Sequence, residues 1–242
     1  MIRTLISLLV AGVFSAQAST DLKPQTESAI RDIQPQLLQW RRHFHQYPEL
    51  SNREVNTAKK VAAHLKSLGL EVQTGIAHHG VLGVLKGAKP GPTVALRADM
   101  DALPVTEQVD LPFASKVRST FNGQEVGVMH ACGHDAHTAM LMATASVLTQ
   151  LKSELTGTVL FVFQPAEEGG AGGKAMVDDG LMTRWGIQEV YGLHNMPGLP
   201  EGYFATTPGP MLASSDTLKI VVRGKGGHAG AAPHEAIDSV LI

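Results

Sequence analysis

The chain has 242 residues, of which 43% are apolar, so it is long enough for one sizeable core and part of a second domain. Its 20 basic and 22 acidic side chains are scattered without a long run of either sign. This pattern lacks the clustered positive charge that binds nucleic acid, and it contains no polybasic patch for a membrane surface. Small, neutral or acidic partners are therefore expected.

Residues 1–18 are typical of a cleavable secretory signal. A short positive start, Met1-Ile2-Arg3, precedes an apolar stretch over residues 4–14, and Ala16-Gln17-Ala18 fits small-x-small cleavage. The apolar stretch is about eleven residues long, too short for the roughly 30 Å core of a bilayer, so a membrane anchor is the weaker alternative. We expect a periplasmic or secreted protein without membrane contact after cleavage.

Apolar periodicity in the remaining chain indicates strands that alternate with helices. The runs at 93–97 and 158–163 are almost wholly apolar, as in strands covered on both faces, and 189–193 is a weaker third candidate. Alternating strands and helices predict an α/β fold with a mainly parallel sheet and helices on both faces. The expected helices span residues 30–44, 55–68, 136–152 and 174–182.

Acidic and imidazole side chains follow each of these strands. Asp99 and Asp101 follow the first strand, Glu167 and Glu168 the second, and His194 the third. In open α/β sheets, ligands bind beyond the carboxyl ends of the strands. We therefore expect these side chains to converge at one edge of the sheet.

The octapeptide "HACGHDAH", residues 130–137, holds the only cysteine of the chain. Residues two apart in an extended segment point to the same side, so Cys132 and His134 can face one metal centre. Thiolate, imidazole and carboxylate together favour a divalent transition metal over magnesium or calcium. The alternative is a buried, inert cysteine, because free cysteine is among the most buried residue types.

Glu167 and Glu168 are adjacent, so their side chains point in different directions and can divide two roles. One can bind metal while the other takes a proton from activated water, which is the arrangement of a hydrolase. The alternative is a solvated acidic loop. This alternative is disfavoured, because Pro165 and Gly169-Gly170 flank the pair at the end of a buried strand.

Five segments carry a resemblance to a known family: "RRHFHQYPELS", "LRADMDALP", "MHACGHDAH", "QPAEEGG" and "GLHN". In this order and spacing, from about Trp40 to the C-terminus, the chain resembles the amidohydrolase branch of the aminoacylase and carboxypeptidase-G superfamily of dinuclear metallopeptidases. Hippurate hydrolases, N-acyl-amino-acid amidohydrolases and indoleacetyl-amino-acid hydrolases belong to this superfamily. The resemblance implies a zinc-peptidase-like catalytic domain.

The resemblance also implies a role for each matching residue. Two divalent metal ions are expected, manganese or zinc first and cobalt or nickel next, with Glu167 as general base and Asp101 supporting a ligand. Asp99 is expected to be structural. The implied ligands are Cys132, His134, Glu168 and His194, and no metal role is implied for His43, His45, His64, His78, His79, His130 or His137.

The implied reaction is amide hydrolysis of N-acyl or N-aroyl amino acids, or of small peptides. The metal pair would activate water and polarise the acyl carbonyl, and Glu167 would take the proton and deliver it to the departing amine. Two rivals remain: a non-catalytic metal- or peptide-binding protein on the same scaffold, and a thiol hydrolase with Cys132 as nucleophile. No GxGxxG or GxxxxGK[ST] follows a strand, so nucleotide cofactors have no support.

From about Ser214 the sequence pattern changes, and "TLKIVVRGKGGHAGAAPHEAID" predicts a strand and a glycine-rich turn that lead to a helix. The resemblance implies that residues 19–213 are the N-terminal part of the catalytic domain. Residues 214–242 would begin an inserted α+β lid, through which relatives form homodimers. His228 matches a lid histidine that helps to bind the substrate or the oxyanion, and a simple turn histidine is the alternative.

Two departures from the family pattern lie in this last segment. One extra residue separates His228 from Pro233-His234, and "AIDSVLI" stops in an apolar helical pattern without a cap. The resemblance implies a further histidine ligand beyond Ile242. With four of five ligands, we expect these 242 residues alone to bind metal weakly, fold poorly or be inactive.

Overall fold

The computed structural model describes residues 21–214, 216 and 218–241. It forms two compact units that divide between Asn195 and Met196. The expected signal segment, residues 1–18, lies outside the described residues, and the domain boundary expected at 213/214 stays a prediction. Among the described residues, no helix combines the length and the apolar character needed to span a bilayer.

The first unit is built on a five-stranded sheet with the strand order β1-β2-β6-β3-β7. The three expected strands are confirmed: β3 pairs in parallel with both β6 and β7. Two strands that the sequence analysis did not anticipate join antiparallel, so the sheet is mixed and the α/β class is confirmed. The strands are β1 (Glu71–Ile76), β2 (Gly80–Lys86), β3 (Lys89–Asp99), β6 (Thr156–Gln164) and β7 (Glu189–Gly192).

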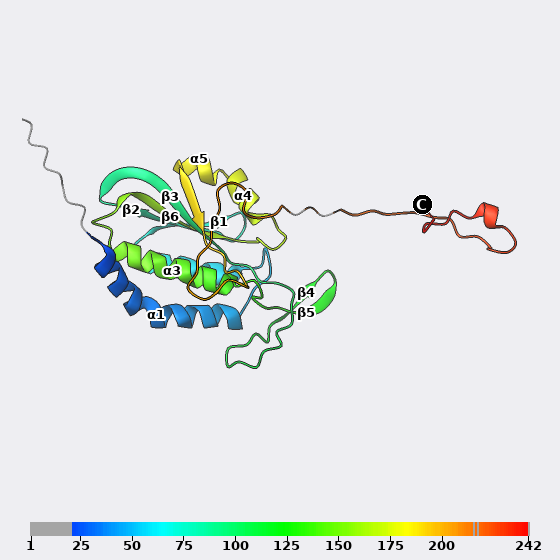
Figure 1. Ribbon diagram of the computed structural model, residues 1–242, viewed down its shortest axis with the longest axis horizontal. Helices are drawn as coiled ribbons and strands as arrows, with labels where there is room; N and C mark the ends of the chain where they lie inside the picture. Colours follow the sequence, from blue (N-terminus) through cyan, green and yellow to red (C-terminus); the bar gives the residue numbers. More distant parts are fainter. Residues whose placement is uncertain (1–20, 215, 217, 242) are drawn as a thin grey trace, which may run out of the picture. The chain divides into compact units, whose positions relative to one another are not determined.

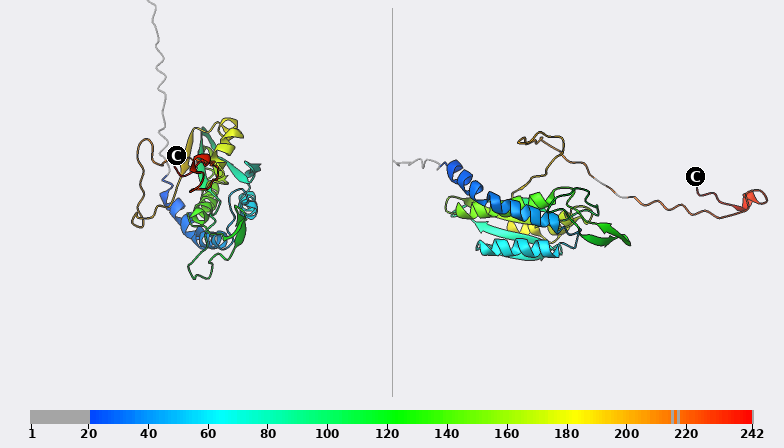
Figure 2. Two further views of the ribbon diagram at one scale, coloured as in Figure 1. Left: turned by 90° about the vertical axis from the view of Figure 1, so that its right-hand side faces the viewer. Right: turned by 90° about the horizontal axis from the view of Figure 1, so that it is seen from below.

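Helices cover both faces of this sheet, as expected. One face carries α2 and α3, with α1 packed along α3, and the opposite face carries α4 and α5 (Figure 1). Figure 2 (right) looks onto the first face, with α1 in blue and α2 in cyan. The helices are α1 (Lys23–Gln46), α2 (Val55–Ser67), α3 (His134–Gln150), α4 (Gly172–Asp178) and α5 (Leu181–Trp185).

The helix expected over 174–182 is two short helices instead of one. Gly180 takes a left-handed conformation with φ +84° between α4 and α5. Glycine reaches this conformation without a steric penalty, so it ends one helix and starts the next in a new direction.

The alternating side chains of β6 explain the two hydrophobic layers. Phe161 and Phe163 pack in the cluster under α1, α2 and α3, whereas Leu160 and Val162 pack in the cluster under α4 and α5. Successive side chains of a strand point to opposite faces, so a wholly apolar run suits a strand that is covered twice. Each fully buried side chain of this kind contributes about 1.5–3 kcal/mol.

A long segment between β3 and α3 leaves the sheet and returns to it. It carries a two-stranded hairpin, β4 (Arg118–Phe121) and β5 (Gln124–Gly127). A bridge between Leu103 and Met129 closes the base of this segment. The octapeptide therefore comes back to the carboxyl end of β3, next to Asp101.

The second unit contains little regular structure in its described residues. It has one 3₁₀ helix, η1 (Pro233–Glu235), and one isolated bridge between Lys225 and Ile237. The strand expected after Ser214 was wrong for the described residues, which are irregular there. A strand needs a hydrogen-bonded neighbour, and residues 218–222 pair with none among the described residues.

Candidate metal centre

The carboxyl ends of three strands meet at one edge of the sheet. Because β6, β3 and β7 run parallel, they end together at Gln164, Asp99 and Gly192. Helix α3 begins at the same edge with His134, after Gly133 at φ +86°. The convergence that the sequence predicts is confirmed.

His134 lies buried at the centre of this edge. Its Nδ1 donates a hydrogen bond to the backbone carbonyl of Asp101 at 2.8 Å, which leaves the lone pair of Nε2 free. Nε2 lies 3.7 Å from Oε1 of Glu168 and 3.6 Å from Oδ1 of Asp99. Burial lowers the pKa of His134, but the carboxylates of Asp101 and Asp99 raise it overall.

Cys132 and His194 face each other beside His134. The Sγ atom of Cys132 lies 3.5 Å from Nε2 of His194, whose Nδ1 donates to the carbonyl of Asn195 at 2.6 Å. Burial and the charge of Glu168 raise the pKa of the Cys132 thiol to about 11. A protonated thiol is a poor nucleophile, whereas a bound cation displaces its proton.

The two glutamates differ in exposure. The Glu167 side chain is 41% exposed, with Oε2 4.0 Å from Nε2 of His134, and the Glu168 side chain is 17% exposed. Burial raises the pKa of Glu168; the positive charge of His134 opposes this rise and the charge of Glu167 adds to it. The pair therefore presents one inward and one more accessible carboxylate.

Three buried atoms at this edge have no hydrogen-bond partner among the described residues: Nε2 of His134, Oε1 of Glu168 and Oδ1 of Asp101. Buried polar atoms without partners are costly, so a ligand is expected to satisfy them. The ligand atoms of Cys132, His134 and His194 lie within 4.8 Å of one another, as do those of His134, Glu167 and Glu168. This donor set fits a divalent transition metal.

Asp99 and His137 lie together at this edge, where Asp99 was expected as a structural residue and no metal role was expected for His137. Oδ1 of Asp99 accepts from Nδ1 of His137 at 2.7 Å, and Oδ2 accepts from Arg97 at 2.6 Å. Burial raises the pKa of Asp99, but His137 and Arg97 bring it well below its usual value. With His134, the two residues form a third, fully buried group of possible ligands. His137 follows His134 by three residues on a helix, so the two side chains lie on the same side of it. This spacing could have indicated that His137 belongs to the site.

Asp101 contacts both the imidazole and the glutamate loop. Its Oδ1 lies 3.4 Å from Nδ1 of His134, and its Oδ2 accepts from Oγ of Ser51 at 2.6 Å and from the backbone N–H of Glu168 at 2.9 Å. Burial raises the pKa of Asp101, but the nearby imidazole of His134 and the hydrogen bond from Ser51 lower it overall. Its position agrees with the supporting role expected of it.

His228 lies exposed in the second unit. Its Nδ1 accepts from the backbone N–H groups of Gly230 at 3.2 Å and Ala231 at 3.0 Å. This is the local geometry of a turn histidine, so its expected role at the substrate stays a prediction.

Two other histidines are buried and have different surroundings. His45 bridges Asp135 and Glu107 through its two ring nitrogens, at 2.9 Å each, so it makes specific polar contacts in addition to packing. His130 is buried without a partner for either nitrogen among the described residues, and burial lowers its pKa to about 4. His130 is therefore neutral near pH 7.

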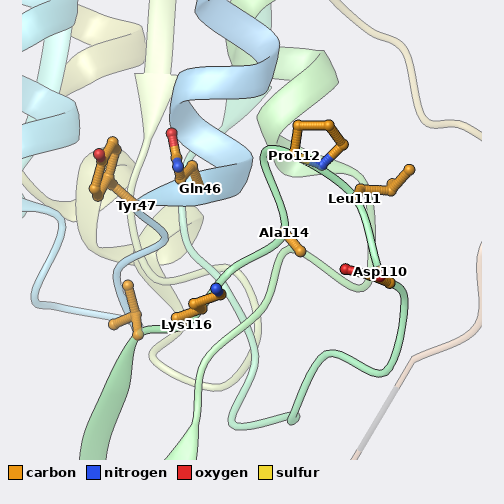
Figure 3. A pocket seen from close by; sticks show the side chains of 8 residues that line it. Gln46, Tyr47, Asp110, Leu111, Pro112, Ala114 and Lys116 are labelled. Carbon is orange, nitrogen blue, oxygen red and sulfur yellow. The ribbon is translucent and has the colours of Figure 1, made fainter.

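A separate pocket of about 730 Å³ lies where α1 ends, against the loop that carries Asp110 and Lys116 (Figure 3). Gln46 and Tyr47 line its α1 side. None of the expected ligands, nor Glu167, lines this pocket, so it is not part of the candidate metal centre.

The α/β sheet carries thiol, imidazole and carboxylate groups at one edge, and this donor set is suited to a metal-binding protein. Residues 95–241, more than half of the chain, match the family described as Peptidase family M20/M25/M40. The chain belongs to this family, as the five motifs predict.

Similar proteins cover most of this chain. It is 49% identical over 225 residues to Thermostable carboxypeptidase 1 of Saccharolobus solfataricus, covering 92% of this chain and 54% of that protein. It is 42% identical over 221 residues to an N-acyl-L-amino acid amidohydrolase of Geobacillus stearothermophilus, covering 91% and 57%. The chain spans about half the length of the curated relatives it matches.

A solved structure supports the fold. The YXEP protein of Bacillus subtilis, described as a dinuclear metal binding peptidase of the M20 family, superposes with a TM-score of 0.63 at 44% identity. The match covers 70% of this chain and 45% of that one.

Proposed function

We propose that the protein is a metal-dependent amidohydrolase, which cleaves N-acyl or N-aroyl amino acids or small peptides to a carboxylic acid and an amino acid. The observation that carries this proposal is the set of buried, unpartnered atoms around His134 next to the pair of Cys132 and His194. Membership of the peptidase family, and the relative named as an N-acyl-L-amino acid amidohydrolase, support the same reaction class.

The proposed ligands of two divalent cations are Cys132, His134, Glu168 and His194. Manganese or zinc is the first expectation, and cobalt or nickel suits the same mixed donors. When bound, the cations would supply Lewis acidity that lowers the pKa of water and polarises the acyl carbonyl.

The chain's own groups would perform the proton transfers. Glu167 is the more exposed glutamate, so it would take the proton of the attacking water and deliver it to the departing amine. Asp101 would fix the tautomer of His134 through its carbonyl. His228 would help to bind the substrate or the oxyanion.

The remaining proposals concern the protein in the cell. The signal-like pattern of residues 1–18 supports a periplasmic or secreted location. The resemblance of residues 214–242 to a lid supports a homodimer. The partner molecules are expected to be small acylated amino acids or peptides.

The test uses the complete polypeptide that contains these residues and a panel of N-acetyl and N-benzoyl amino acids. Hydrolysis should stop after dialysis against a chelator and return with manganese or zinc. Hydrolysis that survives chelation but not alkylation would support a thiol hydrolase instead. Metal binding without hydrolysis of any member of the panel would support a non-catalytic binding protein.

A further inference from the structure

The loop after β6, which carries both glutamates, has a constrained backbone. Ala166 is fully buried and takes a left-handed conformation with φ +51°. This conformation costs free energy for a residue with a Cβ atom and persists only where surrounding contacts hold it. The carbonyl of Ala166 accepts from the N–H groups of Gly170 at 3.2 Å and Gly172 at 3.1 Å, so the loop folds back on this residue.

Two carboxylates from other parts of the chain hold this loop. The N–H of Ala166 donates to Oε1 of Glu54 at 2.8 Å, and the N–H of Glu168 donates to Oδ2 of Asp101 at 2.9 Å. These two amides lie on either side of Glu167 in the sequence. The backbone from which Glu167 and Glu168 project is therefore anchored at two points.

The position of Glu54 before α2 does not explain the placement of its side chain. It is the N-cap of α2, yet its side chain makes no capping hydrogen bond. The cap comes from Glu49, whose carboxylate accepts from the N–H groups of Asn56 at 3.0 Å and Thr57 at 2.9 Å. The Glu54 side chain is thus free to reach the glutamate loop.

The surroundings of Glu54 are costly for a carboxylate. The residue is fully buried, and its Oε1 accepts from the N–H groups of Ala166 and of Asn52, the latter at 3.0 Å. Its Oε2 has no partner among the described residues. Burial of a carboxylate with one unpartnered oxygen disfavours folding, so a compensating role is expected.

We propose that Glu54 is a positioning residue of the metal centre, which holds the amide of Ala166 so that Glu167 and Glu168 project toward His134. The inference rests on the proposed function, because it gives a purpose to the orientation of the two glutamates. Among the described residues, Glu54 accepts hydrogen bonds only from the backbone N–H groups of Asn52 and Ala166, so in this role it acts through the backbone of the loop.

Two variants separate the acceptor position from the charge. Glu54→Asp keeps the charge but withdraws the carboxylate by one methylene group from Ala166. Glu54→Gln keeps an acceptor oxygen in place but removes the charge. Glu49→Asp is the matched control, because it shortens a glutamate in the same segment whose side chain caps α2 and makes no hydrogen bond to the loop among the described residues.

The experiment measures the dissociation constant for Mn²⁺ of the chelator-stripped complete polypeptide by calorimetry, well below the melting temperature of each variant. Loss of a group that orients a ligand weakens metal affinity by roughly 10–100-fold, and we expect this range for Glu54→Asp. Glu54→Gln should stay close to the wild type. Glu49→Asp should lower the melting temperature without changing the affinity.

Wild-type affinity in Glu54→Asp would overturn the inference. If Glu54→Gln lost as much Mn²⁺ affinity as Glu54→Asp, the role of the acceptor oxygen would be overturned. If Glu49→Asp lost as much Mn²⁺ affinity, the loss would reflect lower stability in general, and the specific role of Glu54 would be overturned. A wild-type protein that binds no Mn²⁺ or Zn²⁺ would overturn the proposed function itself, which separates the two failures.

Discussion

A buried histidine between two carboxylates allows a quantitative prediction of how the stability of the protein depends on pH. Both ring nitrogens of His45 contact carboxylate oxygens, those of Asp135 and Glu107, at 2.9 Å each. Donation to both requires the protonated ring. The hydrogen bond with Asp135 raises the pKa of His45 above its ordinary value of 6.5, and Glu107 adds to this against the opposing effect of burial.

We predict that His45→Gln lowers the free energy of unfolding by about 3 kcal/mol at pH 5.5, because removing one partner of a buried ion pair costs about 3–5 kcal/mol. The folded pKa lies above the unfolded one, so this stabilisation is fully present below pH 6.5. It is lost as the pH rises through the folded pKa. Above the folded pKa, a neutral ring donates to one carboxylate only, as glutamine does, so the difference should shrink toward about 1 kcal/mol as the pH rises.

The assay is urea unfolding followed by circular dichroism, with chelator present, at pH 5.5 and pH 9. The neighbouring His43→Gln serves as the control, because His43 is exposed on the same helix and burial lowers its pKa, so any change between the two pH values should have the opposite sign. An equal loss of stability in His45→Gln at both pH values would refute a charged bridge and indicate packing alone.

Three further substitutions test the candidate site. Glu167→Gln should lower turnover by at least about 10²-fold with unchanged metal content, measured by elemental analysis, and unchanged turnover would remove Glu167 from the mechanism. Gly133→Ala should destabilise the protein by about 1–3 kcal/mol, because its φ of +86° is left-handed and the added Cβ would overlap the side chain of Asn195; an unaltered melting temperature would contradict this. His228→Ala should reduce kcat/KM while metal affinity stays the same, and a change in metal affinity alone would argue against substrate or oxyanion binding.

The buried strands could be predicted from the sequence, but the exposed or glycine-rich strands could not. β6 is almost wholly apolar because helices cover both of its faces. β1 is an exposed edge strand with polar residues, so it lacks a clear period of two. In β2, Gly80 and Gly83 interrupt the apolar run where other parts of the chain approach closely, including Leu65 at Gly83.

The candidate ligands could be found because their chemistry stands out at the ends of predicted strands. The residues that surround them could not be found in this way, because their roles depend on contacts between distant parts of the chain. His45 and Asp135 are 90 residues apart, and Glu54 and Ala166 are 112 apart. The sequence does not show which of the glutamates before α2 caps that helix, and only the tertiary structure shows Glu49 in that role and Glu54 at the loop.

The location of bound metal tests the central claim most directly. A crystal structure of the complete polypeptide with manganese or zinc, with anomalous data at the absorption edge of the metal, should show two peaks between Cys132, His134, Glu168 and His194. For zinc, the distance to the Cys132 sulfur should be about 2.3 Å. Peaks away from this edge of the sheet, or a Cys132 sulfur outside ligand distance of either ion, would contradict the account.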